Sequence, residues 1–386
     1  MPAVSEQPIY LDYNATTPIA PEVLDAMLPV LRDGFGNPSS SHAYGTAARA
    51  LVGRAREQVA ALLGCSPGEV IFTSGGTESN NAALIGIAEA TRDKGRHLVT
   101  SAIEHPAVAA TCDYLEGRGW EVTRLGVDHD GRIRLDELAR AVRPETTLIS
   151  IMHANNETGV LQPIEEIRES IAPLGAILHT DAAQSVGKVD CRVDRLGVDA
   201  LTLAGHKLYA PKGVGALYLR RGTPCERYLH GASHETGLRA GTENVAQIVG
   251  LGRACELAAQ EGTTREQHLS QLRDRIEARL RAEFSDLVVH GAGAARLPNT
   301  LYAAIPRTSA IELLDAVPGI AAAAGSACDA GKAHVSATLR AMGIDESIAL
   351  ATLRLTVGCP TTVDEVERAS QLLVEAGRRL RRSAAQ

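Results

Sequence analysis

One side chain in this sequence could react with a carbonyl compound, and two others could bind the same ligand. Lys207 comes shortly after the apolar run Ala200–Ala204, and a lysine amine that sheds its water can form a Schiff base with an aldehyde. Asp181 directly follows another apolar run, Ala176–Thr180, and Gln184 lies one helical turn further on. Because parallel strands present ligand-binding groups at their carboxyl ends, we expect these side chains to meet at one edge of a sheet.

A glycine-containing segment, residues 73–79 (Thr-Ser-Gly-Gly-Thr-Glu-Ser), joins a predicted strand to a predicted helix. Gly76 lets the backbone approach a ligand, the first N–H groups of the helix attract an anion, and Thr77 adds a hydroxyl donor. No Gly-Lys-Ser/Thr follows, so this is not a Walker loop, and alone it could be only a turn and a helix cap. With Asp181 and Lys207, however, it completes the anion cradle, carboxylate and amine that pyridoxal phosphate requires.

Two further residues could assist such chemistry. His105 comes two residues after the predicted strand His97–Ile103. It could stack on a flat ring and move protons near neutral pH. Cys328 lies in a run of small residues, 325–331 (Gly-Ser-Ala-Cys-Asp-Ala-Gly). We expect this run to form a mobile, accessible loop, which suits a reactive thiol. The other six cysteines have no accompanying motif and are expected to be small packed residues.

The elements that must position these residues follow an alternating pattern from about residue 69 to residue 220. Continuous Val/Ile/Leu-rich runs predict strands buried on both faces. These strands are Glu69–Thr73, His97–Ile103, Glu121–Val127, Thr147–Met152, Ala176–Thr180, Ala200–Ala204 and Gly215–Leu219. Helical patterns such as Thr77–Lys94 and Ile164–Ala172 separate them. The sequence therefore predicts an α/β fold with a mostly parallel sheet flanked by helices.

The rhythm changes after a long helical pattern over residues 245–282. Short strands and helices are predicted there at Asn299–Ile305, Ile311–Ala316, Ala351–Val357 and Asp364–Arg381. This pattern indicates a second, smaller α+β domain. We predict that residues 16–261 form the large cofactor-binding domain, and that residues 1–15 and 262–386 form the small domain, which carries Cys328.

Composition excludes several classes of protein. The chain has 386 residues, 45% of them hydrophobic, and a net charge of −7, which is typical of a globular protein and not of a disordered one. Mild acidity and only 3% aromatic residues argue against direct binding of nucleic acid. We find no long apolar run for a membrane span and no signal peptide at the start. Seven cysteines without CxxC spacing suggest a reducing compartment, so we expect a cytoplasmic protein without a metal site.

These residues and their order resemble the cysteine desulfurases of the class V aminotransferase family, which have fold type I of the pyridoxal-phosphate enzymes. The resemblance covers nearly the whole chain. It is carried by residues 10–18, 35–39, 73–79, 104–106, 154–159, 179–181, 205–207, 239–244 and 325–328, and by Arg354. The family usually has a serine at Ala204 and an arginine at Cys359, so the chain departs from its pattern at these positions.

The resemblance implies a role for each matching residue. Lys207 would hold pyridoxal 5'-phosphate covalently, Asp181 would pair with its ring nitrogen, Gln184 would bind its ring hydroxyl, and His105 would stack on the ring. Phosphate contacts are implied for Gly76, Thr77 and His206, and for Thr242 of a partner subunit, so a homodimer is expected. Asn155 and Arg354 would hold the substrate, and Cys328 would be the nucleophile.

The implied activity is removal of sulfur from L-cysteine, which leaves L-alanine and a persulfide on Cys328 for an unidentified acceptor protein. A selenocysteine lyase and a class V aminotransferase on the same fold remain alternatives, and an aminotransferase would not need Cys328. A non-catalytic relative would not need Lys207 or Cys328. A nicotinamide dehydrogenase is disfavoured, since no Gly-x-Gly-x-x-Gly follows the first strand.

Overall fold

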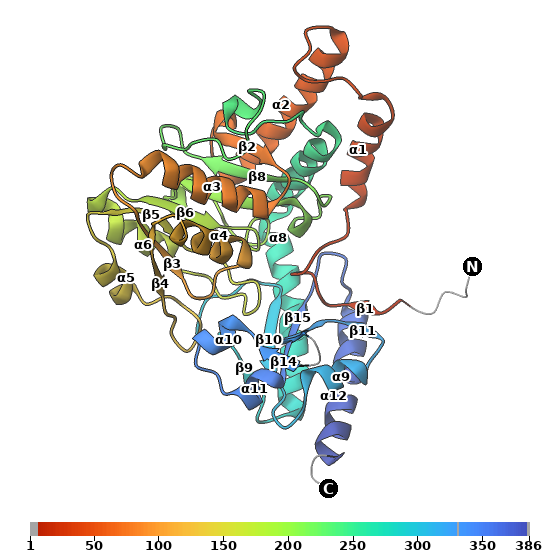
Figure 1. Cartoon of the computed structure of the whole chain (residues 1–386). Helices are drawn as coiled ribbons and strands as arrows, with labels where there is room; N and C mark the ends of the chain where they lie inside the picture. The colour runs from red at the N-terminus through yellow and green to blue at the C-terminus, as the bar shows by residue number, and fades with distance from the viewer. Residues whose placement is uncertain (1–6, 330–331, 384–386) are drawn as a thin grey trace.

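The central sheet has seven strands in the order β2–β8–β7–β6–β5–β3–β4 (Figure 1). Their bounds are Val70–Thr73 (β2), His97–Ser101 (β3), Glu121–Leu125 (β4), Thr146–Ser150 (β5), Ile177–Asp181 (β6), Ala200–Ala204 (β7) and Gly215–Leu219 (β8). Neighbours pair in parallel except β8, which runs antiparallel to both β2 and β7. The predicted strands and the predicted fold class are confirmed, with small shifts at the strand ends.

This architecture comes from a computed structural model that describes residues 7–329 and 332–383, and only the backbone at positions 326–329 and 332–334. The prediction that Cys328 is the nucleophile therefore concerns a side chain outside the described part of the chain.

Helices cover both faces of the sheet because successive strand residues point to opposite sides. Leu98 of β3 and Leu148 of β5 pack against α3 (Gly76–Thr91) and α4 (Pro106–Glu116). Their chain neighbours Val99 and Ile149 belong to the core on the other face. That core also contains residues of α2 (Ala43–Leu63), α6 (Ile164–Ile171), α7 (Val193–Leu196) and the first half of α8 (Val245–Glu283). The central sheet is thus buried between two helical layers.

The C-terminal part is built on an antiparallel sheet in the order β12–β15–β10–β9. Its strands are Val288–Val289 (β9), Thr300–Ala304 (β10), Ala323–Ala324 (β12) and Thr352–Thr356 (β15). The second half of α8, α9 (Ala310–Asp315) and α12 (Val363–Ser383) share a separate hydrophobic core with this sheet. The short helices α10 (Ala337–Ala341) and α11 (Glu346–Leu350) complete this part. The predicted small region of mixed strands and helices is therefore present.

The two parts are joined by the N-terminal segment and by α8. Strand β1 (Ile9–Tyr10) pairs with β11 (Ile320–Ala321) in the C-terminal part, and α1 (Pro21–Asp33) then packs along α8. Helix α8 is interrupted at Gly262, whose φ and ψ are +30° and −110°. The break lies beside the predicted boundary between residues 261 and 262, and the boundary itself stays a prediction.

Cys328 lies in a strand, where the sequence predicted a loop. Strand β13 (Ser326–Asp329) pairs antiparallel with β14 (Lys332–Val335), and Cys328 lies opposite Ala333. Two residues separate the strands, a spacing typical of a tight hairpin. Small residues and two glycines suggested an irregular segment, but cross-strand pairing was the stronger influence. The hairpin forms a sheet of its own and pairs with no other described strand.

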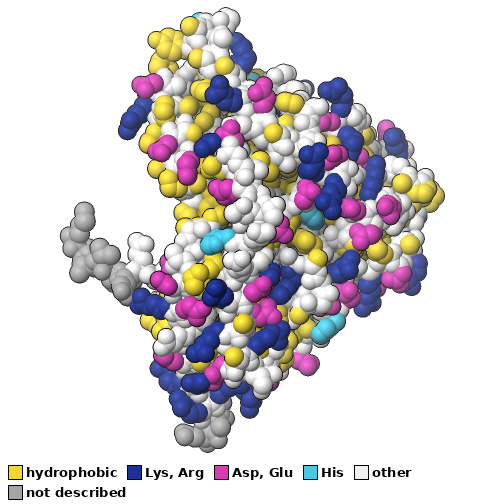
Figure 2. Space-filling model, turned by 180° about the vertical axis from the view of Figure 1, so that it is seen from behind, with side chains coloured by type: hydrophobic (Ala, Val, Ile, Leu, Met, Phe, Trp, Pro, Cys, Tyr) yellow, Lys and Arg dark blue, Asp and Glu magenta, His cyan; other side chains and the backbone are white. Residues whose placement is uncertain are grey.

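Charges of both signs are interspersed over the face in Figure 2, where no large area of a single sign is seen. Apolar side chains remain accessible near α1 and α2. Leu31, Phe35 and Tyr44 are 59%, 79% and 59% exposed, and the rings of Phe35 and Tyr44 stack with centroids 5.1 Å apart. This apolar group lies at the end of α1 and the start of α2, away from the central sheet.

Candidate active site

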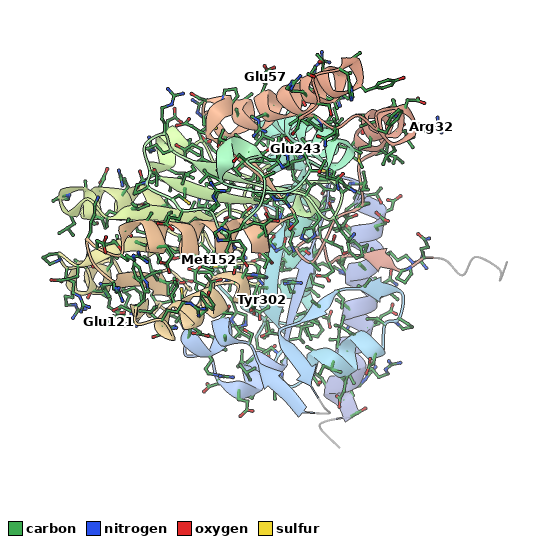
Figure 3. All side chains as sticks on the ribbon, turned by 45° about the horizontal axis from the view of Figure 1, so that its top comes forward. Arg32, Glu57, Glu121, Met152, Glu243 and Tyr302 are labelled. Atoms are coloured by element: carbon green, nitrogen blue, oxygen red, sulfur yellow. The ribbon has the colours of Figure 1, made fainter. Side chains whose placement is uncertain are left out.

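A cavity of about 300 Å³ opens at the carboxyl ends of the central strands. It collects eight of the residues singled out in the sequence: Gly76, Thr77, His105, Asp181, Gln184, His206, Lys207 and Arg354. The last of these comes from β15, so both parts of the molecule contribute to the wall. Met152, which also lines the cavity, is labelled near the middle of the molecule in Figure 3.

Lys207 ends a short 3₁₀ turn, η3 (Gly205–Lys207), that follows β7 directly. Its Nζ donates to the backbone oxygens of Asn14 and Ala15 at 2.5 and 2.7 Å. Burial and, next, the Arg354 guanidinium lower the pKa of the amine against the opposing carboxylates of Asp12 and Asp181, and the net result is a pKa of about 8. An amine in this condition loses its proton much more readily than a surface lysine and can act as a nucleophile.

Asp181 is the last residue of β6 and is only 6% exposed. Its Oδ1 accepts from the backbone N–H of Ala183 at 2.9 Å, and its Oδ2 accepts from Nδ2 of Asn80 at 2.7 Å. Asn80 lines the cavity from α3, and its Oδ1 is buried without a partner among the described residues. The carboxylate is thus held in one orientation by two donors and faces the cavity.

The part of the cavity at the start of α3 suits an anion. Helix α3 begins there at Gly76, and the preceding Gly75 has φ +150°, a conformation that favours glycine. A Cβ added to Gly76 would lie 3.3 Å from the Cβ of Ala204, so the start of α3 packs closely on the end of β7. Thr77 and His206 line the same region, and Nδ1 of His206 is 3.1 Å from Oγ1 of Thr16. Free N–H groups at a helix start attract phosphate.

His105 caps the N-terminus of α4, where its Nδ1 accepts from the backbone N–H of Ala107 at 3.1 Å. This contact assigns the ring proton of the neutral form to Nε2. Partial desolvation lowers the pKa of His105, Asp181 raises it, and the Lys207 ammonium lowers it. The imidazole is therefore favoured in its neutral form, which can stack on an aromatic ring and exchange a proton through Nε2.

Arg354 reaches the cavity from β15, in the middle of the C-terminal sheet. One terminal nitrogen donates to Oδ1 of Asp12 at 2.8 Å and the other donates to the backbone oxygen of Asn156 at 3.2 Å. Its Nε is buried without a described partner. Each terminal nitrogen carries a second hydrogen and Arg354 lines the cavity, so the guanidinium can still donate to a ligand. A planar guanidinium is well suited to a carboxylate.

Two predicted residues, Asn155 and Thr242, do not line the cavity. The amide of Asn155 is fully buried and bonded to protein groups, with Oδ1 accepting from the backbone N–H groups of Glu157 and Thr158. Its neighbour Asn156 lines the cavity instead. Thr242 is exposed in the segment before α8, which is compatible with a role in another subunit. The position of Cys328 is described by its backbone only. The roles of all three stay predictions.

Sequence reasoning missed three residues at the site: Asn80, Lys188 and Asn14. Asn80 and Asn14 line the cavity, and Lys188 lies directly behind it. Asn14 links the two parts of the chain, since its Nδ2 donates to Oγ1 of Thr300 on β10. Asn80 lies within one helical turn of the glycine segment, which is a signal that could have found it. Lys188 lies four residues after Gln184, but its contact with Asn14, 174 residues away, is not visible in any local pattern.

Two negative findings apply to the described residues. None of their helices is long and apolar enough to cross a membrane. No group of three His, Cys, Asp or Glu side chains in residues 7–329 and 332–383 is arranged to hold a metal ion.

Comparisons with known proteins agree with this geometry. The pattern of the Aminotransferase class-V family matches residues 9–369. The cysteine desulfurase IscS of Anaeromyxobacter sp. (strain Fw109-5) is 46% identical over 378 residues, which are 97% of this chain and 93% of that protein. Among solved structures, a NifS-like protein is 35% identical with a TM-score of 0.89, covering 96% of this chain and 99% of that one. SspA, solved in complex with cysteine, is 36% identical with a TM-score of 0.80, covering 90% of this chain and 98% of that one.

Proposed function

Because the chain belongs to the class-V aminotransferases, we propose that it is a pyridoxal-phosphate-dependent cysteine desulfurase. One observation carries the proposal: Lys207, Asp181 and His105 line a single cavity that is also lined by the start of α3. The names of the relatives support the same reaction, since many are cysteine desulfurases and SspA was solved with cysteine. The substrate is then L-cysteine and the products are L-alanine and a persulfide on Cys328.

The donor set fits pyridoxal phosphate. A deprotonated Lys207 amine can join the aldehyde, the Asp181 carboxylate can accept from the ring nitrogen, and the start of α3 with Thr77 can bind the phosphate. Ala204 offers no hydroxyl to that phosphate, so His206 and the backbone of α3 would supply more of its contacts. When bound, this cofactor withdraws electrons from the substrate Cα, which makes the α-proton removable.

The residues of the chain would divide the remaining work. Arg354 binds the substrate carboxylate, and its hydrogen bonds to Asp12 and Asn156 hold the guanidinium in position for that contact. Lys207 Nζ, with a pKa of about 8, can hold or release a proton near neutral pH. His105 Nε2 offers a second site for proton movement on the other side of the cavity. Substrate orientation and proton transfer are then both provided by fixed groups.

Cys328 would take the sulfur. Its thiolate forms an S–S bond with the substrate sulfur while the Cβ–S bond breaks, and the electron pair of that bond stays with carbon, which gains a proton. L-cysteine and the Cys328 thiol thus become L-alanine and the Cys328 persulfide, with atoms and electrons balanced. Burial raises the pKa of four other cysteines to about 12, so they stay protonated at neutral pH: Cys65, Cys112, Cys191 and Cys225.

We also propose that the enzyme is a homodimer with a shared site, and that it works in a reducing compartment such as the cytoplasm. The exposed position of Thr242 supports the first point, because a partner subunit could receive it at the phosphate. The segment that holds Thr242 is anchored from within by Arg239, whose Nε donates to Oε1 of Glu78 at 2.8 Å. The sulfur acceptor is a second protein that can approach Cys328.

The first test is to load the protein with pyridoxal phosphate, reduce it with borohydride and map the labelled peptide. The second test is to measure the alanine and the sulfide that form from L-cysteine in the presence of dithiothreitol. We expect the label on Lys207 and equal amounts of alanine and sulfide. Lys212→Ala, an exposed lysine nearby, is the matched control and should change neither result. A label on another lysine, or alanine without sulfide, would contradict the proposal.

A further inference from the structure

Lys188 is buried directly behind the cavity. It lies in the segment between β6 and α7 and is only 8% exposed. Its Nζ donates to Oε1 of Gln184 at 3.1 Å and to Oδ1 of Asn14 at 3.2 Å. Both described partners are amide oxygens. A buried ammonium without a facing carboxylate is costly. Stability alone is therefore a poor reason for a lysine at this position.

Each partner of Lys188 also contacts the active site. Gln184 Oε1 accepts from Lys188, so its Nε2 must be the donor, and it donates to the backbone oxygen of Asn14 at 2.9 Å. This backbone oxygen also accepts from Lys207 at 2.5 Å. The second hydrogen of Gln184 Nε2 has no acceptor among the described residues, and Gln184 lines the cavity. An amide that could otherwise flip is thus fixed with its N–H side available to a ligand.

We propose that Lys188 is a positioning residue of the active site: it fixes Gln184 as a hydrogen-bond donor to the cavity and holds Asn14, whose backbone oxygen orients Lys207. The inference rests on the proposed function, because a donor at Gln184 matters for a ligand with an acceptor oxygen, such as the ring hydroxyl of pyridoxal phosphate. Lys188 itself does not line the cavity and acts through its two partners.

The charge state of Lys188 is compatible with this role. Burial, together with the Lys207 ammonium, lowers the pKa of Lys188 to about 7. Because the pKa of Lys207 is about 8, Lys188 is mostly neutral where Lys207 titrates, and it acts through its two hydrogen bonds and not through charge. The charged or titratable groups that face Lys207 are Asp12, His105, Asp181, His206 and Arg354. Without Lys188, Gln184 would lose its fixed donor orientation, and a ligand oxygen without that donor would hold the proton of the Lys207 nitrogen to higher pH.

The first test compares wild type with Lys188→Met, a variant of similar length without the amine. The absorbance of bound pyridoxal phosphate is titrated with pH, and the melting temperature of the cofactor-free protein is measured. We expect the midpoint of the titration to rise by about half a pH unit or more. We expect only a small change in melting temperature, because removal of the costly buried amine offsets the loss of its hydrogen bonds to Gln184 and Asn14. Lys212→Met removes an exposed positive charge near His206 and should leave the midpoint in place. A lower melting temperature with an unchanged midpoint would show a merely structural role and overturn the proposal.

The second test is a double-mutant cycle with Gln184→Met. If Lys188 acts through Gln184, Lys188→Met should weaken cofactor binding several-fold in wild type and much less in the Gln184→Met background. Equal effects in both backgrounds would overturn the proposal. Lys188→Gln, uncharged and polar, replaces Lys188→Met in both tests if the latter does not fold.

Failure of the proposed function would look different. In that case wild type itself would show no cofactor attached at Lys207. If wild type binds the cofactor there and Lys188→Met has the wild-type midpoint and affinity, only the inference about Lys188 is wrong.

Discussion

The cavity wall and the Cys328 hairpin are built in opposite ways. In the cavity, Asp181 has two donors, Lys207 has two acceptors, and both stand at the ends of strands in a seven-stranded sheet. The hairpin of β13 and β14 is a two-stranded sheet that pairs with no other described strand. Isolated two-stranded hairpins are marginally stable. The difference matches two tasks, since proton chemistry needs fixed groups whereas sulfur transfer needs a thiol that reaches both substrate and acceptor.

The largest expected effect separates these two regions. Cys328→Ala should lower sulfide release from L-cysteine at least about 1,000-fold, because the nucleophile is gone. Pyridoxal phosphate binding and its change in absorbance on addition of L-cysteine should remain, since Lys207, Asp181 and Arg354 are untouched. Cys359→Ala, in which a half-buried cysteine is removed, is the control and should retain activity. Loss of cofactor binding in Cys328→Ala would mean that the two regions are not independent.

Asp181→Ala tests the fixed region, with an expected loss of about 100-fold or more in kcat. The ring nitrogen would lose its carboxylate, so electron withdrawal from the substrate would weaken. Asn80→Ala, which removes one donor to the carboxylate and leaves Asp181 in place, should have a much smaller effect. Steady-state kinetics of alanine formation measure both variants, and equal losses would show that the Asp181 charge is not what matters.

Arg354→Gln should act on substrate binding. We expect the KM for L-cysteine to rise about 10-fold to 100-fold, because a charge-assisted contact to the substrate carboxylate is lost. The melting temperature should fall as well, because the ion pair with Asp12 is mostly buried, with 13% and 22% of the two side chains exposed, and Asp12 loses its partner. A lower kcat with the same KM would show that Arg354 does not hold the substrate.

The pH dependence of cofactor loading sharpens the account of Lys207. Attachment needs the neutral amine, and burial lowers the pKa of Lys207 from its ordinary value of 10.5 to about 8. The rate of covalent loading onto cofactor-free protein should therefore rise up to about pH 8 and then level off. Stopped-flow absorbance measures this rate. A rate that still rises tenfold per pH unit above pH 9 would indicate an unperturbed lysine.

Ala204→Ser should give the smallest change. The end of β7 packs against Gly76 at the start of α3, where a hydroxyl could reach a bound phosphate. We expect the dissociation constant for pyridoxal phosphate to fall about 2-fold to 10-fold, the value of one added hydrogen bond. Equilibrium dialysis checks it. An affinity lower than wild type would show that the close packing of α3 on β7 leaves no room for the hydroxyl.

The sequence predicted the central sheet and most of the cavity because both depend on local patterns. Buried strands read as apolar runs, and the residues after them must meet at the same edge, so Lys207, Asp181 and His105 could be brought together in advance. The hairpin at Cys328 was missed because its pairing is cross-strand and its composition resembles a loop. Lys188 was missed because its contact with Asn14 spans 174 residues, and because its contact with Gln184, four residues away, does not by itself show that the lysine is buried.

The central claim is that sulfur leaves L-cysteine in the fixed cavity and arrives on Cys328. The most direct measurement is mass spectrometry of the wild-type protein, loaded with pyridoxal phosphate, given L-cysteine without reductant, alkylated and digested. The account predicts one extra sulfur atom on the peptide that contains Cys328 and on no other cysteine peptide. An extra sulfur on the peptide of Cys359, or on none while alanine is formed, would contradict it.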